Sequence, residues 1–397
     1  MSRIFYTFLY VMTLVGLFNS CNLEEIPDNS VPGGTGNASK FETSVGGNSN
    51  DFPNDAITSS DGGFVIVGYS QSFTAGDNQA YIVKLDSKGK QTWESNFGGA
   101  QDDYANAVTP TSDGGYVLCG RTRSFSTSQD IFLVKVNASG GKVWDKFYGA
   151  ADSTETAFGI VPIGTNGDLL VGYLSDKGTG TSQIKFLRIN SNGTKVGNKL
   201  AFSGKFGLTD MIKTSDGKIV VVGSGYADNG TVTYLARFNE DGSFIWENRY
   251  PAQPTNYTPA FDVVELSDKT LVVAGSDLGS NDHDFNLVAY NQIGTKLWHK
   301  TWGGANADEL FAITLSKDNQ LVVMGYTSSF SGNNEFYLSK RKATDGNQIW
   351  ERNFIPIANL WGALATASDG GFLLVGGENA ANADILVVKT NENGEYK

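Results

Sequence analysis

A repeat of about 51 residues constrains the fold of this chain more than any other feature of its sequence. An Asp or Asn in a turn comes just before an apolar segment in each copy: Asp61, Asp113, Asn166, Asp216, Asp268, Asp318 and Asp369. A second marker keeps the same spacing, at Trp93, Trp144, Trp246, Trp298 and Trp350, with Gly197 near the expected place in the third copy. Most of the chain is therefore one structural unit copied seven times.

Each copy has the pattern of four short strands. In the first copy, Asp55 to Ser59 precedes a tight turn at Ser60–Gly63, where Asp and Gly tolerate the backbone that a hairpin demands. Phe64–Tyr69 is nearly continuous in apolar residues, as in a strand buried on both faces. Ala80–Leu85 and the alternating segment Gln91–Phe97 complete the unit. Four strands per period of about 50 residues are typical of a β-propeller blade.

The two ends of the chain predict how the ring closes. The seventh copy starts at Ile355 and stops at Lys397 without an outer strand. Lys40–Gly47 aligns with the outer strand and following glycines of the first copy, Thr92–Gly99. We therefore predict an all-β, seven-bladed propeller over residues 40–397, in which the N-terminal strand completes the last blade and removes an exposed edge. An open β-solenoid, the alternative repeat architecture, would not need this split copy.

Composition excludes several classes of protein. With 48 Gly and 12% aromatic residues, but only 18% charged residues, the chain is turn-rich and does not resemble a disordered protein. The formal charge of −12 argues against nucleic acid as a partner, because neutralising phosphates needs a basic face. Two cysteines are too few for a disulfide scaffold, and two histidines leave little room for a histidine-rich metal site.

The first residues have the layout of a secretory signal. A charged start is followed by an apolar run from Ile4 to Phe18 and then by Ser20 and Cys21. The run is shorter than the roughly 20 residues of a membrane span. Its end at Ser-Cys resembles a bacterial lipoprotein signal, which implies cleavage after residue 20 and lipidation of Cys21; the alternative is a plain secretory signal with an incidental cysteine.

The segment after Cys21 predicts where in the cell the protein is located. Residues 21–39 read as a flexible tether, rich in Gly, Ser, Asn and Pro toward its end. Its early acidic residues, Glu24, Glu25 and Asp28, resemble the surface-export tag of Bacteroidetes-type lipoproteins. The resemblance implies an outer-membrane protein exposed at the cell surface, attached to the membrane through its lipid alone.

The repeat itself resembles a known family. Asp308–Ile313 with Val322–Phe330, and Tyr81–Asp86 with Trp93 and Phe97–Gly99, are similar to the bacterial β-propeller repeats called SBBP-type or delta-60-like. The resemblance covers nearly all of residues 40–397 and implies the fold. It implies little about activity, because that family has no common catalytic set.

Features found in most copies are expected to serve the fold, so departures from the repeat are the better functional candidates. Phe73, Phe125 and Phe330 follow a Ser at the same loop position; they are either an aromatic platform for sugars or plugs between blades. Asp103, Glu155 and Asp308 precede inner strands; they could serve a glycosidase or lyase at the channel mouth, or accept hydrogen bonds from loop N–H groups.

Other candidates are outside the repeat pattern. Trp361, Tyr226 and Tyr257 are off-register aromatic residues on or near loops, and we predict ligand contacts for them. Asp277, Asp282 and Asp284 offer carboxylates that suit Ca²⁺, although a solvated loop explains them as well; no other cofactor is expected. Cys119 lies in an apolar strand and reads as a buried hydrophobic residue.

These observations favour a non-catalytic binding module: a monomeric propeller that binds a glycan or an envelope protein. The alternatives are a carbohydrate-active enzyme that uses channel-mouth carboxylates and a structural component of an envelope complex. An enzyme should bring carboxylates from different blades within about 5 to 10 Å in a deep pocket. A binding module should expose aromatic side chains on a shallow face.

Overall fold

A computed structural model describes residues 39–73, 77–227, 230–250, 258–278, 283–330, 334–378 and 382–396, without the side chains of 227, 278 and 355–361. These residues belong to the compact unit Gly36–Lys397. They form twenty-seven β-strands and no helix, so nothing in the described part of the chain provides a helix suited to crossing a membrane.

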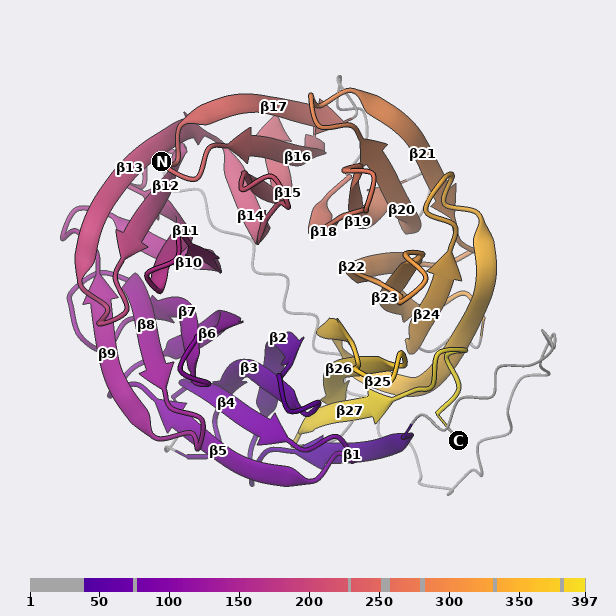
Figure 1. The fold of residues 1–397 in the computed structure, drawn as a ribbon, viewed down its shortest axis with the longest axis horizontal. Helices are drawn as coiled ribbons and strands as arrows, with labels where there is room; N and C mark the ends of the chain where they lie inside the picture. The colour runs from indigo at the N-terminus through magenta and orange to yellow at the C-terminus, as the bar shows by residue number, and fades with distance from the viewer. Residues whose placement is uncertain are drawn as a thin grey trace, which may run out of the picture. The chain divides into compact units, whose positions relative to one another are not determined.

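The strands form seven antiparallel blades arranged in a ring (Figure 1). Blade 1 comprises β2 (Asp51–Thr58), β3 (Phe64–Ser70), β4 (Gln79–Leu85) and β5 (Gln91–Phe97). Blade 2 comprises β6 (Asp103–Pro110), β7 (Tyr116–Thr122), β8 (Asp130–Val136) and β9 (Lys142–Tyr148). Blade 3 comprises β10 (Thr154–Ile163), β11 (Asp168–Asp176), β12 (Ser182–Ile189) and β13 (Lys195–Gly204). Blade 4 comprises β14 (Phe206–Lys213), β15 (Ile219–Ala227), β16 (Gly230–Phe238) and β17 (Phe244–Tyr250). Blade 5 comprises β18 (Ala260–Glu265), β19 (Leu271–Leu278), β20 (His283–Tyr290) and β21 (Lys296–Trp302).

Blades 6 and 7 share one long strand. Blade 6 comprises β22 (Asp308–Leu315), β23 (Leu321–Thr327), β24 (Glu335–Arg341) and the first part of β25 (Gln348–Thr366). The rest of β25 begins blade 7, which continues through β26 (Phe372–Glu378) and β27 (Ile385–Lys389) to β1 (Phe41–Val45). Up to Pro356 β25 pairs with β24, and from Ile357 it pairs with β26. The break predicted near residue 355 is therefore a change of partner within a continuous strand.

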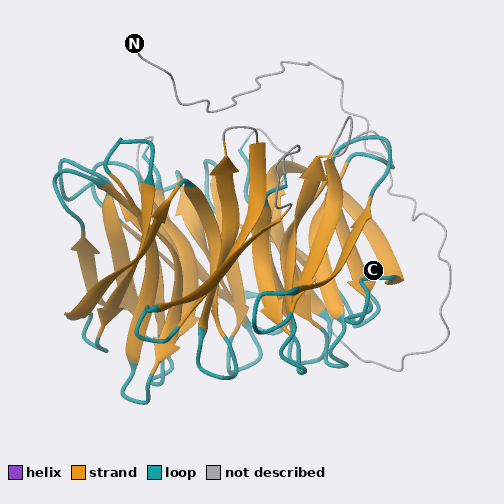
Figure 2. Ribbon diagram, turned by 90° about the horizontal axis from the view of Figure 1, so that it is seen from above, coloured by secondary structure: helices purple, strands orange, loops and turns teal. Residues whose placement is uncertain are grey.

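The first strand of each blade lies nearest the ring centre and the fourth lies at the rim (Figure 1). Seen edge-on, the strands run between two faces that carry the loops (Figure 2). One face carries the hairpin turns between strands one and two and between strands three and four; we call it the hairpin face. The other carries the loops between strands two and three and the connections between blades; we call it the loop face.

The N-terminal strand closes the ring, as predicted. β1 pairs antiparallel with β27, from Phe41 opposite Lys389 to Val45 opposite Ile385. Val45 is buried, and the ring of Phe41 lies 6.2 Å from that of Phe64 in blade 1. The fourth strand of blade 7 thus comes from the opposite end of the chain, and β27 has a hydrogen-bonding partner on both sides.

The core is divided among the seams between blades. Strands two and three are mostly buried because both of their faces are covered, as their apolar composition predicts. The exception is β12 of blade 3, in which only four of the eight residues are buried. Seven apolar clusters each join two adjacent blades; the one between blades 7 and 1 combines Val375 and Ile385 with Phe64 and Ile66. A single blade could not bury these faces alone.

The five repeated tryptophans each contact the following blade at the rim. The indole N–H of Trp93 donates to the carbonyl of Ala138, and that of Trp246 to the carbonyl of Gln292, at 3.0 and 2.9 Å. The Trp93 ring covers Gly140 of the same turn, where a Cβ would lie 2.5 Å from the ring. The third blade lacks its tryptophan, and Phe186 from β12 covers Gly242 of the next blade instead.

A turn carboxylate and a buried cation recur inside the blades. The Asp of the first hairpin turn binds a Lys or Arg near the end of the third strand in five blades: Lys84–Asp61, Lys135–Asp113, Arg237–Asp216, Lys340–Asp318 and Lys389–Asp369. The hydrogen bond from Lys135 holds the pKa of Asp113 down at about 2. In these five blades, the Asp of the repeated turn is therefore explained by an internal ion pair.

The start of the first inner strand also differs from the prediction. The first inner strand begins at Asp51, four residues before the predicted start at Asp55. A register shift between Pro53 and Asp55 interrupts its pairing with β3. This β-bulge breaks the alternation of apolar and polar residues, which concealed the first half of the strand.

Candidate binding face

The loops of blades 1, 2 and 6 share one hydrogen-bonded design on the loop face. In blade 2, Asp103 Oδ2 accepts from the Gly99 N–H at 2.8 Å and from the Ser124 hydroxyl at 2.7 Å. The corresponding acceptors are Asp51, which binds Gly47 and Ser72, and Asp308, which binds Gly304 and Ser329. The carboxylate joins the connection before its strand to the loop after the second strand, and so fixes the residue that follows the Ser.

That following residue is an exposed phenylalanine in all three blades. Phe73, Phe125 and Phe330 are 40, 39 and 54% exposed. One side of the ring still packs on its own blade: Phe73 stacks on Tyr81 with centroids 5.7 Å apart, and Phe125 stacks on Phe147 at 4.9 Å. Both of these contacts lie within a single blade, and all three rings leave apolar surface in solvent, so sugar binding stays a prediction for them.

Tyr226 adds an exposed aromatic ring in blade 4. It is 45% exposed near the loop-face end of β15, and its N–H donates to the carbonyl of Lys205 at 2.9 Å. Tyr257, Asp282 and Cys21 lie outside the described residues, and the side chain of Trp361 does too, although its backbone belongs to β25. The structure therefore places four of the six predicted aromatic contacts: Phe73, Phe125, Phe330 and Tyr226.

The channel-mouth carboxylates are engaged by the protein itself. Asp103 and Asp308 carry the loop hydrogen bonds described above, and burial raises the pKa of Asp103. Glu155 accepts from the Ser175 hydroxyl at 2.8 Å and from the Ala150 N–H at 3.3 Å. Their geometry matches the hydrogen-bonding alternative given for them from the sequence.

Two of the three predicted Ca²⁺-binding aspartates of blade 5, Asp277 and Asp284, are among the described residues. Asp277 and Asp284 are opposite each other on β19 and β20. Burial raises the pKa of Asp277, whose Oδ2 lies 3.9 Å from His299 Nε2. Among the residues that the structure describes, no three His, Cys, Asp or Glu side chains gather as a metal site would require. Cys119 is buried, and burial raises the pKa of its thiol, which makes it a poor nucleophile.

Sequence reasoning missed three carboxylates of the inner strands. Asp55, Asp210 and Asp262 each follow the bulge of their strand, at a position where the other blades carry Ala107, Gly159, Ala312 and Ala363. Asp210 and Asp262 are hydrogen-bonded to each other across the seam between blades 4 and 5. The departure from Ala or Gly at one repeat position was the signal that could have found them.

Two hollows lie on the hairpin face. The larger, of about 360 Å³, lies between the first hairpins of blades 2 and 3 and includes Asp113, Lys135 and Thr165. The smaller, of about 290 Å³, includes Asp268 and Ile293 of blade 5. Neither hollow contains the exposed aromatic residues of the loop face.

Comparisons with known proteins agree on the architecture. Residues 214–244 match the model of a domain of unknown function, the DUF5122 β-propeller. Searching curated proteins finds no match to this chain.

Solved structures of several kinds share the fold. A protein of unknown function from Dyadobacter fermentans is 11% identical with a TM-score of 0.51, over 88% of this chain and 97% of that one. A polysaccharide lyase of family PL25, an ulvan lyase solved with -[GlcA(1-4)Rha3S]-, is 10% identical with a TM-score of 0.56, over 89% and 96%. The WD40 domain of Neurospora crassa Pan2 is 10% identical with a TM-score of 0.52, over 89% and 97%. At these identities the likeness concerns the fold alone, and the chain is a seven-bladed β-propeller repeat protein.

Proposed function

We propose that this protein is a cell-surface lipoprotein whose propeller binds a glycan on its loop face without catalysing a reaction. The observation that carries the proposal is the set of half-exposed rings of Phe73, Phe125 and Phe330, held by the same hydrogen-bonded loop in three blades. A rigid aromatic ring with one face in solvent suits the apolar face of a sugar, and ordering it costs little conformational entropy because the loop is already fixed.

The carboxylates favour binding over the alternative, a carbohydrate-active enzyme. Those of the loop face are hydrogen-bonded to backbone N–H groups and serine hydroxyls. Asp210 and Asp262 come from different blades but touch each other, whereas glycosidases keep their carboxyl groups about 5 to 9.5 Å apart to admit a sugar or water. The likeness to an ulvan lyase leaves a lyase as the second candidate, on the fold alone.

A glycan array tests the binding face with the soluble fragment that begins at residue 36. We expect the triple substitution Phe73→Ala, Phe125→Ala and Phe330→Ala to weaken glycan retention at least tenfold, since the loss of one stacking contact costs roughly 0.5 to 1.5 kcal/mol. Phe244→Ala is the matched control, because Phe244 is 44% exposed but lies at the hairpin-face end of β17.

A second triple variant, Trp361→Ala, Tyr226→Ala and Tyr257→Ala, tests the off-register aromatic residues in the same way. Unchanged retention by both triple variants would reject the loop face as the glycan site. Shortened polysaccharide carrying new unsaturated ends would favour the lyase. Retention of an envelope protein, with no glycan retained, would favour a protein partner.

The lipid anchor has a separate test in a bacterial host that lipidates its own lipoproteins. The full chain should incorporate an alkynyl fatty acid and sediment with outer membranes, and Cys21→Ala should abolish both, because the acyl chains supply the membrane affinity. Cys119→Ala is the control, since Cys119 is buried in blade 2. Equal labelling of the full chain and of Cys21→Ala would show that the cysteine is incidental.

A further inference from the structure

The inner strands carry a carboxylate staple between adjacent blades. Asp55 accepts from the Ala56 N–H of its own blade at 2.7 Å and from the Val108 N–H of blade 2 at 2.9 Å. Asp262 does the same with the Val263 N–H of blade 5 at 2.7 Å and the Ile313 N–H of blade 6 at 2.8 Å. Each acceptor therefore serves an N–H group next to the bulge in the following blade.

Blades 4 and 5 are adjacent, so their two staples meet. Asp210 on β14 accepts from the Val263 N–H of blade 5, and the carboxyl group of Asp262 donates a hydrogen bond to Asp210. Asp210 Oδ2 is buried and has no other hydrogen-bond donor among the described residues. It can therefore accept the hydrogen bond from a protonated Asp262. Two touching carboxyl groups in such a site cannot both be ionised cheaply.

Among the described residues, those at the positions next to the pair carry no positive charge. The residues opposite it in the neighbouring second strands are Val222 and Ala274. β10 and β22, which pack on the outer sides of the two strands, carry Gly159 and Ala312 at the equivalent position. The charge of Asp210 also acts on Asp55 of β2, which is another acidic group, and helps to raise its pKa. A shared proton is therefore the means by which the described residues neutralise the pair.

We propose that Asp210 and Asp262 form a pH-sensitive latch between blades 4 and 5, closed while they share one proton and loosened when that proton leaves. Two negative charges would then repel each other within the seam. The opening would be local, because the other seams contain no touching pair of carboxyl groups at this position among the described residues.

The direction of the pH effect follows from the folded-state pKa values. Burial raises the pKa of Asp210, and burial together with the charge of Asp210 raises that of Asp262 well above its usual value. Burial likewise raises the pKa of Asp55 to about 6. The folded protein thus holds protons that the unfolded chain releases, so stability is greatest below these pKa values and falls as the pH rises through them.

Thermal unfolding of the fragment from residue 36 between pH 5.5 and 8.5 tests the latch. We expect the Tm to fall by about 5 °C over this range. Asp262→Asn should remove at least half of the fall, because an uncharged amide can donate to Asp210 at every pH. Asp145→Asn is the control, because Asp145 is on the rim strand β9, is 38% exposed and lies outside this seam; this variant should keep the wild-type slope.

Hydrogen exchange on the wild-type fragment supplies a test that needs no variant. After correction for intrinsic rates, β14 and β18 should lose protection between pH 6 and 8.5 more than the other inner strands. Equal loss in all seven inner strands, or an unchanged pH slope in Asp262→Asn, would overturn the proposal. So would a Tm rise on adding CaCl₂ at pH 8.5 that Asp262→Asn abolishes, since the pair would then hold a cation.

Discussion

A chain that begins at residue 47, and so lacks β1, is expected to lose at least about 4 kcal/mol of the free energy of unfolding. β1 contributes five paired residues to blade 7 and buries Val45 against the core that joins blades 7 and 1. Burial of one such side chain is worth about 1.5 to 3 kcal/mol, and each ladder hydrogen bond about 0.5 to 1.5 kcal/mol. The contact of Phe41 with Phe64 would also be lost. Urea denaturation followed by tryptophan fluorescence measures the change.

A chain that begins at residue 39 is the matched control, because it keeps β1 and the contacts of Ser39 with Asp369 and Ser87. Its denaturation midpoint should equal that of the longer chain. The chain without β1 exposes the free edge of β27 and should also self-associate, since an unpaired edge recruits other strands. A peptide of residues 39–47 added in trans should reverse part of both effects. Equal midpoints for the two chains would show that β1 does not hold the ring shut.

The closure of the ring by β1 could be predicted because two separate features of the sequence indicate it. Lys40–Gly47 aligns with an outer strand, and the last copy lacks one. The blade count and the turns follow from the same local repetition, because each copy sees the same neighbours. The start of the first inner strand did not follow, since the bulge before Asp55 removes the alternation on which strand prediction depends. The continuous β25 was missed because a strand that changes partners needs no turn residue.

The candidate site could be predicted only in part, because some of its features depend on contacts between strands that are distant in the sequence. The position of Phe125 after Ser124 is a local pattern, so the sequence placed the ring on its loop; its 39% exposure depends on Phe132 and Phe147, which come from other strands. The contact between Asp210 and Asp262 depends on two inner strands standing side by side with their bulges in register. Spacing along the chain gives no measure of that distance.

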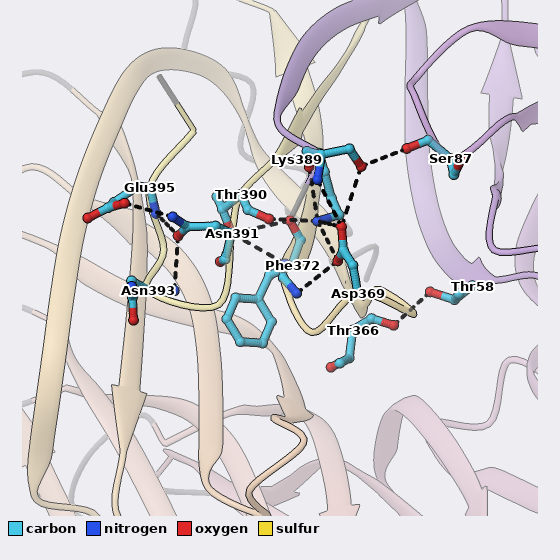
Figure 3. Close-up of polar contacts among 12 residues, drawn as sticks. Thr58, Ser87, Thr366, Asp369, Phe372, Lys389, Thr390, Asn391, Asn393 and Glu395 are labelled. Carbon is cyan, nitrogen blue, oxygen red and sulfur yellow. Dashed lines mark hydrogen bonds and ion pairs between the residues drawn. The ribbon is translucent and has the colours of Figure 1, made fainter. Parts of the chain in front are cut away.

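Asp369→Ala is expected to cost about 3 to 5 kcal/mol, more than any other single substitution at a hairpin turn, because it leaves a buried charge without its partner. The Lys389 side chain is 1% exposed, and its ammonium group lies 2.9 Å from Asp369 Oδ1 (Figure 3). The same group donates to the carbonyls of Thr390 at 2.7 Å and Ser39 at 3.3 Å. Burial lowers the pKa of Lys389, because these few acceptors replace the water that would surround an exposed ammonium group. Chemical denaturation at pH 7 measures the loss.

Lys389→Met separates the cost of a stranded charge from the worth of the ion pair. It removes the buried charge and leaves Asp369, which is 29% exposed, within reach of water, so we expect a change within about 1.5 kcal/mol. The double variant Asp369→Ala with Lys389→Met should recover most of the stability that Asp369→Ala loses, because no ammonium group remains to be desolvated. If the double variant is as unstable as Asp369→Ala, the turn depends on the hydrogen bond from Gly371 to Asp369, and the five recurring ion pairs are a consequence of the blade geometry and do not stabilise it.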